Sequence, residues 1–132
     1  MLELVLPGNP TPWASPTFSR FKVFDKRSKE KDHARKLLRE CYRGDLIAYP
    51  IKLKIEFYLP IPKNTSKSAK EAMELKKIPH QKKPDLTNLI KFAEDMLKGI
   101  VIVDDNLVSK IVAQKFYSFE PRTIFTISAI LR

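Results

Sequence analysis

Hydrophobic and polar residues alternate along several stretches of the chain, and this alternation predicts β-strands. Residues 51–59 alternate between apolar and mostly charged side chains, which is typical of a strand with one buried and one solvated face. Residues 2–6 predict a first strand that ends at Pro7-Gly8. Residues 108–119 and 123–131 are also strand-like, and the turn Glu120-Pro121-Arg122 between them predicts a hairpin.

Other stretches place apolar residues three and four positions apart, which predicts helices. The clearest helix follows Pro84: its apolar positions recur at that spacing from Leu86 to Leu97, and Gly99 ends it. Residues 26–42 predict a second helix with a narrow apolar stripe and a basic outer face. A short polar helix is expected over residues 69–76, opened by a capping-box pattern at residues 68–71.

Two further segments carry weaker patterns. Residues 8–19 are rich in proline and predict an ordered loop without regular structure. Residues 100–103 form a short β-branched run, interpreted as a strand that Asp104-Asp105-Asn106 ends. The element order is therefore strand-helix-strand-helix-strand-strand. This order predicts an α+β fold with a small mixed sheet, in a single domain over residues 1–132.

The charge balance indicates a polyanionic partner. Lysine and arginine outnumber aspartate and glutamate by 25 to 15, for a formal net charge of +10. Each phosphate that a protein neutralises releases a condensed counterion, so such an excess favours nucleic acid; the alternative is a basic protein without that role. Cys41 is the single cysteine, which excludes an internal disulfide framework. No apolar run approaches the ~20 residues of a membrane span, so a soluble cytoplasmic protein that does not engage a membrane is expected.

Against this basic background, acidic residues gather in one stretch. Asp85 precedes the central helix, Lys91 lies on that helix, and Asp104 and Asp105 follow the next apolar run. Each feature has an ordinary structural reading: Asp85 as a helix N-cap, the acidic pair as turn residues, and Lys91 with Asp95 as a surface ion pair.

Taken together, the same residues predict a metal site. If the helix packs beside the strand that it leads into, Asp85, Asp104 and Asp105 converge, and carboxylates on rigid element ends suit Mg²⁺. Such an ion can bind a phosphodiester and activate water, while Lys91 stabilises developing negative charge. The residues alone therefore indicate a metal-dependent nuclease.

The motif around these acids resembles the RusA-type Holliday junction resolvases of bacteria and their prophages. That family's core pattern reads approximately KPDxDNLxK, then DALxG, then an apolar run and DD. The corresponding segments here are KPDLTNLIK at residues 83–91, DMLKG at 95–99 and VDD at 103–105. PIKLKIEFYLP at residues 50–60 is similar to the family's central strand, and LPGNPTP at residues 6–12 to its opening.

The resemblance implies a homodimer that binds four-way DNA junctions and nicks two opposing strands symmetrically with Mg²⁺, or with Mn²⁺ in its place, without an organic cofactor. Carried over by position, Asp85 and Asp105 match acidic catalytic residues and Lys91 matches the essential lysine. Asp104 matches the first acid of the DD pair, so Asp85, Asp104 and Asp105 are the expected metal ligands. The implied role is in DNA recombination and repair.

One position departs from the family pattern: Thr87 stands where a second aspartate is usual. A hydroxyl replaces a carboxylate there, which removes a negative charge and a strong oxygen ligand. Either Asp104, Glu94 or another acid completes the site, or the protein is a junction-binding relative that is non-catalytic or weakly active. A third hypothesis is a small basic RNA-binding protein, although no RNA-stacking motif is present.

Lysines before the acidic motif are the predicted DNA contacts. A four-way junction presents closely spaced phosphates, which a basic segment can follow, although such a segment can also be a solvated loop. Trp13, Phe18 and Phe21 can wedge into an opened junction, although packing is the commoner role of such residues. His80 can act as a ligand or proton shuttle, or simply be exposed. The predicted DNA-binding residues are Lys67, Lys70, Lys76, Lys77, Lys82 and Lys83.

Overall fold

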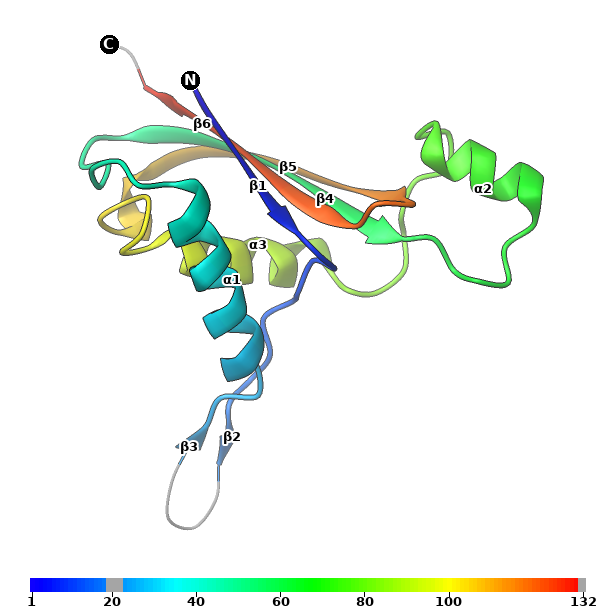
Figure 1. Ribbon diagram of the computed structural model, residues 1–132, viewed down its shortest axis with the longest axis horizontal. Coiled ribbons are helices and arrows are strands. Elements are labelled where there is room, and N and C mark those ends of the chain that lie inside the picture. Colours follow the sequence, from blue (N-terminus) through cyan, green and yellow to red (C-terminus); the bar gives the residue numbers. More distant parts are fainter. Residues whose placement is uncertain (19–22, 131–132) are drawn as a thin grey trace.

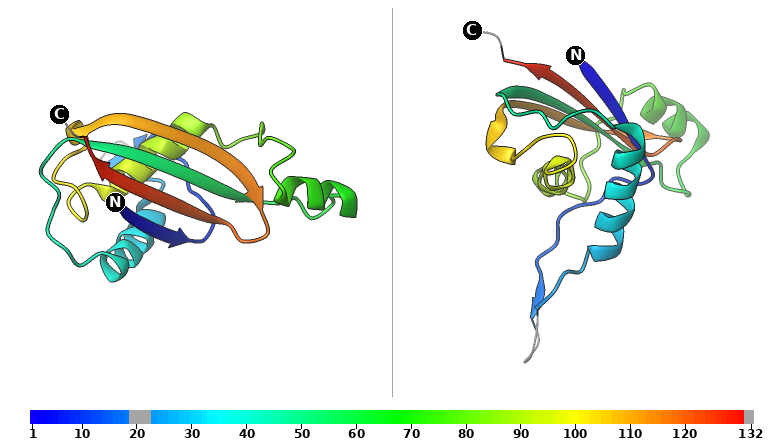
Figure 2. Two further views of the ribbon diagram at one scale, coloured as in Figure 1. Left: turned by 90° about the horizontal axis from the view of Figure 1, so that it is seen from above. Right: turned by 60° about the vertical axis from the view of Figure 1, so that its left-hand side comes forward.

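A four-stranded mixed sheet forms the body of the protein, and two helices cover one of its faces (Figure 1). The computed structural model describes residues 1–18 and 23–130. The strands are β1 (Leu2–Pro7), β4 (Ile51–Pro60), β5 (Val108–Ser118) and β6 (Arg122–Ala129), in the order β1-β6-β4-β5. Helices α1 (Ser28–Cys41) and α3 (Leu86–Leu97) lie together on the same side (Figure 2). The predicted α+β class with a mixed sheet is confirmed.

Strand β4 is the centre of the sheet because its alternating residues have one strongly apolar face. Ile51, Leu53, Ile55 and Phe57 are all buried against the helices, whereas Lys54 between them is exposed. Burying four large apolar side chains stabilises the sheet by roughly 1.5–3 kcal/mol for each of them. The alternation of this strand is thus the main sequence signal for the sheet.

The predicted hairpin between the last two strands is wrong. β4 lies between β5 and β6, parallel to β5 and antiparallel to β6, so the last two strands are not hydrogen-bonded to each other. The link at residues 119–121 therefore spans two strand spacings, roughly 10 Å, which three residues reach easily. The turn signal correctly marks a chain reversal, but it carries no information on which strand lies between the two arms.

The helices follow the apolar period of the sequence closely. α3 buries Leu89, Phe92, Ala93, Met96 and Leu97 over the sheet. Helix α1 packs its narrower apolar stripe, which includes two buried residues, beside α3 and β1. Both predicted helices are confirmed, with ends within two residues of those expected.

Residues 100–103 do not form the predicted strand. Gly99, with φ of 80°, turns the chain after α3, and Ile100, Val101 and Ile102 are buried in the turn that follows. Their apolar side chains are buried in the core without forming a strand ladder, since Ile102 makes only isolated bridges. The acidic pair consequently precedes β5 instead of ending a strand, with a short 3₁₀ helix η1 (Asp105–Leu107) between.

Two small elements complete the fold. Residues 8–19 were expected to be irregular, but Thr17–Phe18 (β2) pairs with Val23–Phe24 (β3). The expected polar helix exists as α2 (Lys67–Glu74), although its cap is Ser66, whose hydroxyl accepts from the Ala69 N–H at 3.3 Å, and not Ser68. Across the described ranges, none of the helices is long and apolar enough to span a bilayer.

Candidate active site

One face of α3 carries three of the polar residues singled out by the sequence. Thr87, Lys91 and Glu94 lie three or four positions apart and therefore share a helical face. Together with Ile90 and Asp95 of the same helix, they line a pocket of about 250 Å³ that Asp105 and Trp13 close. The pocket thus joins the helix to the segment before β5 and to the loop after β1.

Asp85 lies in an adjoining pocket at the start of α3. It occupies the N-cap position, as predicted, but its side chain makes no capping hydrogen bond. A second pocket of about 360 Å³ is lined by Asp85, Trp13 and Asn88, with Pro12, Lys83 and Pro84. Trp13 is the wall between the two pockets, and its backbone N–H donates to the Asn88 carbonyl at 2.8 Å. The Asp85 carboxylate is therefore not used to cap the helix.

Lys91 is oriented by an aromatic ring. Its Nζ lies 3.5 Å from the centre of the Trp13 ring, a cation–π contact that holds the ammonium at the pocket. The alternative ion pair with Asp95 does not form, because Asp95 contacts Lys31 at 3.5 Å instead. Trp13 therefore packs against Lys91, whereas Phe21 and the side chain of Phe18 lie outside the described residues.

The two acids of the DD pair have different surroundings. Asp104 accepts from the Asp105 N–H at 2.9 Å and contacts Lys98 at 3.2 Å. The hydrogen bond from Lys98, followed by those from Asp105, lowers the pKa of Asp104. Asp105, in contrast, lines the pocket on α3. Of the pair, Asp105 is the acid that is available at the pocket, whereas Asp104 is already paired.

Glu94 faces Asp105 across the pocket. Burial, and then the negative charge of Asp105, raise the pKa of the Glu94 carboxyl. None of the ion pairs in the described part of the chain involves either residue. The two carboxylates share the pocket with the Lys91 ammonium, and a bound cation would further reduce the repulsion between them. Glu94 lies two helical turns after Thr87, so helical spacing in the sequence is the signal that places both residues on one face of α3.

The donor set of this pocket fits a hard divalent cation. Glu94 and Asp105 supply carboxylates and Thr87 a hydroxyl, all of them oxygen ligands, and Mg²⁺ commonly uses one or two carboxylates and retains several waters. Among residues 1–18 and 23–130, no three His, Cys, Asp or Glu side chains are grouped so as to hold a metal by themselves. Because Asp95, the third carboxylate of the pocket, is paired with Lys31, a metal here would rely on Glu94 and Asp105 with water and phosphate oxygens.

The predicted DNA-binding lysines lie along α2 and the segment that leads to Asp85. Helix α2 projects beyond the end of the sheet, away from α1 (Figures 1 and 2). Lys76 is engaged, because its Nζ contacts the Tyr58 hydroxyl at 3.2 Å and lies 4.5 Å from the Phe116 ring centre. Lys67, Lys77, Lys82 and Lys83 are exposed, and Lys70 is half-buried.

His80 lies in neither of these pockets. Its ring packs on Tyr117 with centroids 4.5 Å apart. Burial, and then the charge of Lys115, lower the pKa of His80. These contacts favour a packing role for this histidine.

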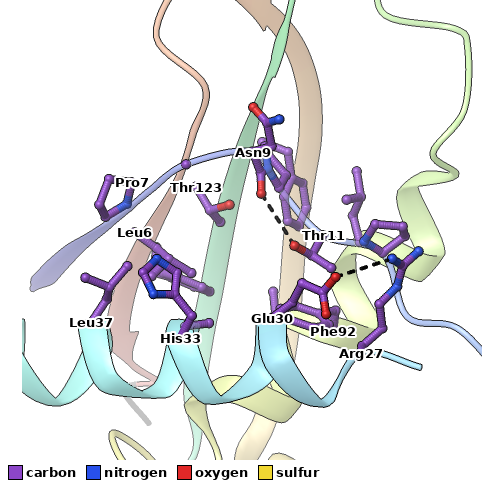
Figure 3. Close-up of a pocket in the computed structure, with 18 residues that line it drawn as sticks. Leu6, Pro7, Asn9, Thr11, Arg27, Glu30, His33, Leu37, Phe92 and Thr123 are labelled. Carbon is purple, nitrogen blue, oxygen red and sulfur yellow. Dashed lines mark hydrogen bonds and ion pairs between the residues drawn. The ribbon is translucent and has the colours of Figure 1, made fainter. Parts of the chain in front are cut away.

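A larger cavity of about 490 Å³ lies on the other side of α3, between α1 and residues 6–12 (Figure 3). Its walls are mainly apolar and include Leu37 and Phe92, while an ion pair of 3.9 Å joins Arg27 to Glu30 at its edge. None of the predicted catalytic residues lines it.

A small α+β protein of high positive charge, with carboxylates and a lysine around a helix-face pocket, has the features of a nuclease. Comparison with known families matches residues 7–128 to the family described as endodeoxyribonuclease RusA. The chain is a member of this family. It is also 34% identical over 79 residues to the uncharacterized protein YqaN of Bacillus subtilis (strain 168); the aligned part covers 58% of this chain and 56% of YqaN.

Proposed function

We propose that the protein is a Mg²⁺-dependent endodeoxyribonuclease that resolves four-way DNA junctions by paired symmetric nicks in DNA recombination and repair. The observation that carries this proposal is the pocket on α3, where Lys91, Glu94 and Asp105 meet beside Asp85. Membership of the RusA family supports the choice of DNA as substrate. We further propose that residues 1–132 act as one catalytic domain in the cytoplasm.

Within this proposal the side chains have separate roles. Glu94 and Asp105 supply oxygen ligands at the pocket on α3, Asp85 adds a carboxylate in the adjoining pocket, and Asp104 supports the segment through Lys98. A bound Mg²⁺ would polarise the scissile phosphate and lower the pKa of an attacking water. Lys91, held against Trp13, places its ammonium where negative charge accumulates on the phosphate in the transition state. Trp13 positions the lysine, and Thr87 orients water at the helix start.

The substrate would be held by charge rather than by base sequence. Lysines of α2 and of residues 82–83 contact phosphates. Along the chain these lysines lead to Asp85, which lies beside the pocket on α3. We propose a homodimer because symmetric nicks on opposing strands need two active sites with the same orientation relative to the junction.

A specific observation supports a second candidate function, that of a junction-binding relative without efficient cleavage. Thr87 replaces the usual acid. Of the three described carboxylates that line the pocket on α3, Asp95 is paired with Lys31, which leaves Glu94 and Asp105 for a metal. Such a protein would bind four-way DNA and leave it intact.

The deciding experiment is cleavage of a synthetic four-way junction at low salt with Mg²⁺ and then Mn²⁺, with linear duplex as the control substrate. Paired, junction-specific nicks that Asp105→Asn abolishes would support the resolvase. Asp104→Asn is the matched control, because the Asp104 side chain pairs with Lys98 and its loss should reduce cleavage less. Retarded junctions without nicks would favour the binding protein, and preference for a competitor RNA would contradict both.

A further inference from the structure

Lys115 reaches from the sheet to the segment that precedes Asp85. It lies on β5 opposite Phe57, so its side chain leaves the sheet on the face covered by the helices. Its Nζ donates to the Lys82 carbonyl at 2.6 Å and to the Pro84 carbonyl at 2.9 Å. A charged donor makes stronger hydrogen bonds to carbonyls than a neutral one does. One ammonium thus binds two points of the same loop.

The bound segment has few other attachments. Residues 78–84 are in neither a helix nor a strand, and they make no backbone–backbone hydrogen bond with another described residue. A segment with so few backbone bonds is expected to open locally at low free-energy cost. The hydrogen bonds of Lys115 and the packing of His80 on Tyr117 therefore contribute strongly to holding its path.

The point of attachment is adjacent to the candidate site. Pro84 is joined directly to Asp85, whose own side chain makes no cap contact that would fix it. Asp85 therefore takes its position from the backbone on either side: α3 on one side and the carbonyl held by Lys115 on the other. Displacement of about 1 Å in a reacting or ligating group can reduce a rate by roughly 100-fold.

We propose that Lys115 is a positioning residue, which holds the Lys82–Pro84 backbone so that the Asp85 carboxylate stays beside the α3 pocket. This inference rests on the nuclease function proposed above. Two of the three N–H donors of Lys115 are used on carbonyls, so its role differs from that of a lysine contacting a phosphate. The sequence alone gave no reason to separate Lys115 from the other lysines.

The test compares Lys115→Met with Lys110→Met, a matched control on the same strand, where Lys110 is exposed and pairs with Lys52 in the register. Lys115→Met should lower the single-turnover rate of junction cleavage by roughly 10- to 100-fold. Its junction Kd should stay close to that of the control, because no phosphate contact is lost. Lys115→Arg should keep most of the rate, since a guanidinium can still donate to both carbonyls.

A second readout does not depend on activity. Limited trypsin digestion, followed by mass spectrometry, reports opening of the loop through cutting between Lys82 and Lys83. This cutting should increase several-fold in Lys115→Met relative to Lys110→Met and to cutting within α1. If Lys115→Met does not fold, Lys115→Gln replaces it with the same expectation, because a shorter neutral amide cannot span both carbonyls.

The results separate this inference from the proposed function. Unchanged cutting at the loop overturns the positioning role, whether or not the wild-type protein cleaves DNA. A loss of junction affinity with a smaller salt dependence, at an unchanged single-turnover rate, also overturns it, because it would identify a phosphate contact. A wild-type protein that leaves junctions intact, with a loop that Lys115→Met loosens, would contradict the nuclease proposal alone.

Discussion

Restoring an acid at position 87 is the most direct test of how the pocket works. Thr87 is an exposed residue in the first turn of α3 and lines the same pocket as Lys91, Glu94 and Asp105. The first turn of this helix carries no acidic residue. Thr87→Asp therefore adds a carboxylate both to the positive end of the helix dipole and to the proposed metal site.

The two effects have different magnitudes and can be separated by Mg²⁺. Without metal, an acid in the first turn gains about 0.3–1 kcal/mol from the helix dipole, and about 0.3–0.5 kcal/mol from Lys91 four residues later. Repulsion from Asp85 and Asp105 offsets part of this gain. With saturating Mg²⁺, a tenfold gain in metal affinity adds about 1.4 kcal/mol of stability. For a chain of this length, that corresponds to a further rise in Tm of roughly 3–6 °C.

Thermal unfolding with and without Mg²⁺ measures both effects, and junction cleavage under the same conditions measures their consequence. Thr87→Asn is the matched control, because it has nearly the shape of aspartate but no charge. We expect the Mg²⁺-dependent rise in Tm to be larger for Thr87→Asp than for Thr87→Asn, with a lower Mg²⁺ requirement for cleavage. An equal rise in the two variants would refute the assignment of this pocket as the metal site.

Three further results are expected. Leu97→Ala, at a fully buried position of α3, should lower the free energy of unfolding by about 2–5 kcal/mol in denaturant unfolding. A decrease below about 1 kcal/mol would contradict the placement of Leu97 in the core. Burial and the charge of Lys115 lower the pKa of folded His80, so the unfolded chain binds more protons and stability should fall as pH drops below about 6.5. Urea titrations at pH 7 and pH 5 should show a smaller loss of stability for His80→Gln than for the wild type. An equal loss would exclude His80 as its source. Lys70→Ala in α2 and Lys77→Ala just after it should each reduce the slope of log K against log salt for junction binding by about 0.9. An unchanged slope in both variants would remove residues 67–77 from the DNA interface.

Much of the fold was predictable because single elements carry strong local patterns. The alternation of residues 51–59 and the helical period of residues 86–97 each describe one element packed on one core, and both predictions are confirmed. The predictions were wrong where the tertiary placement of a segment does not follow from its local sequence pattern. The apolar run at residues 100–103 is buried as a turn, and the reversal at residues 119–121 passes over a strand that came much earlier in the chain.

The candidate site was also predictable only in part. Helical spacing correctly placed Thr87 and Lys91 on one face. That Asp105 faces Glu94, while Asp104 turns to Lys98, depends on the path of the chain after Gly99, which no local pattern specifies. The contacts of Lys115 join positions more than thirty residues apart, and a lysine on an alternating strand gives no sign of its partner.

The strand order has a consequence for synthesis of the protein. Every pairing in the main sheet involves β5 or β6: β1 pairs with β6, and β4 pairs with both. A nascent chain that ends before Val108 therefore contains no strand pair of this sheet, although it already carries α3 with Asp85 and Lys91. The platform beneath α3 is completed only after β5 and β6 have been synthesised. Chains terminated before these strands would consequently lack an assembled pocket.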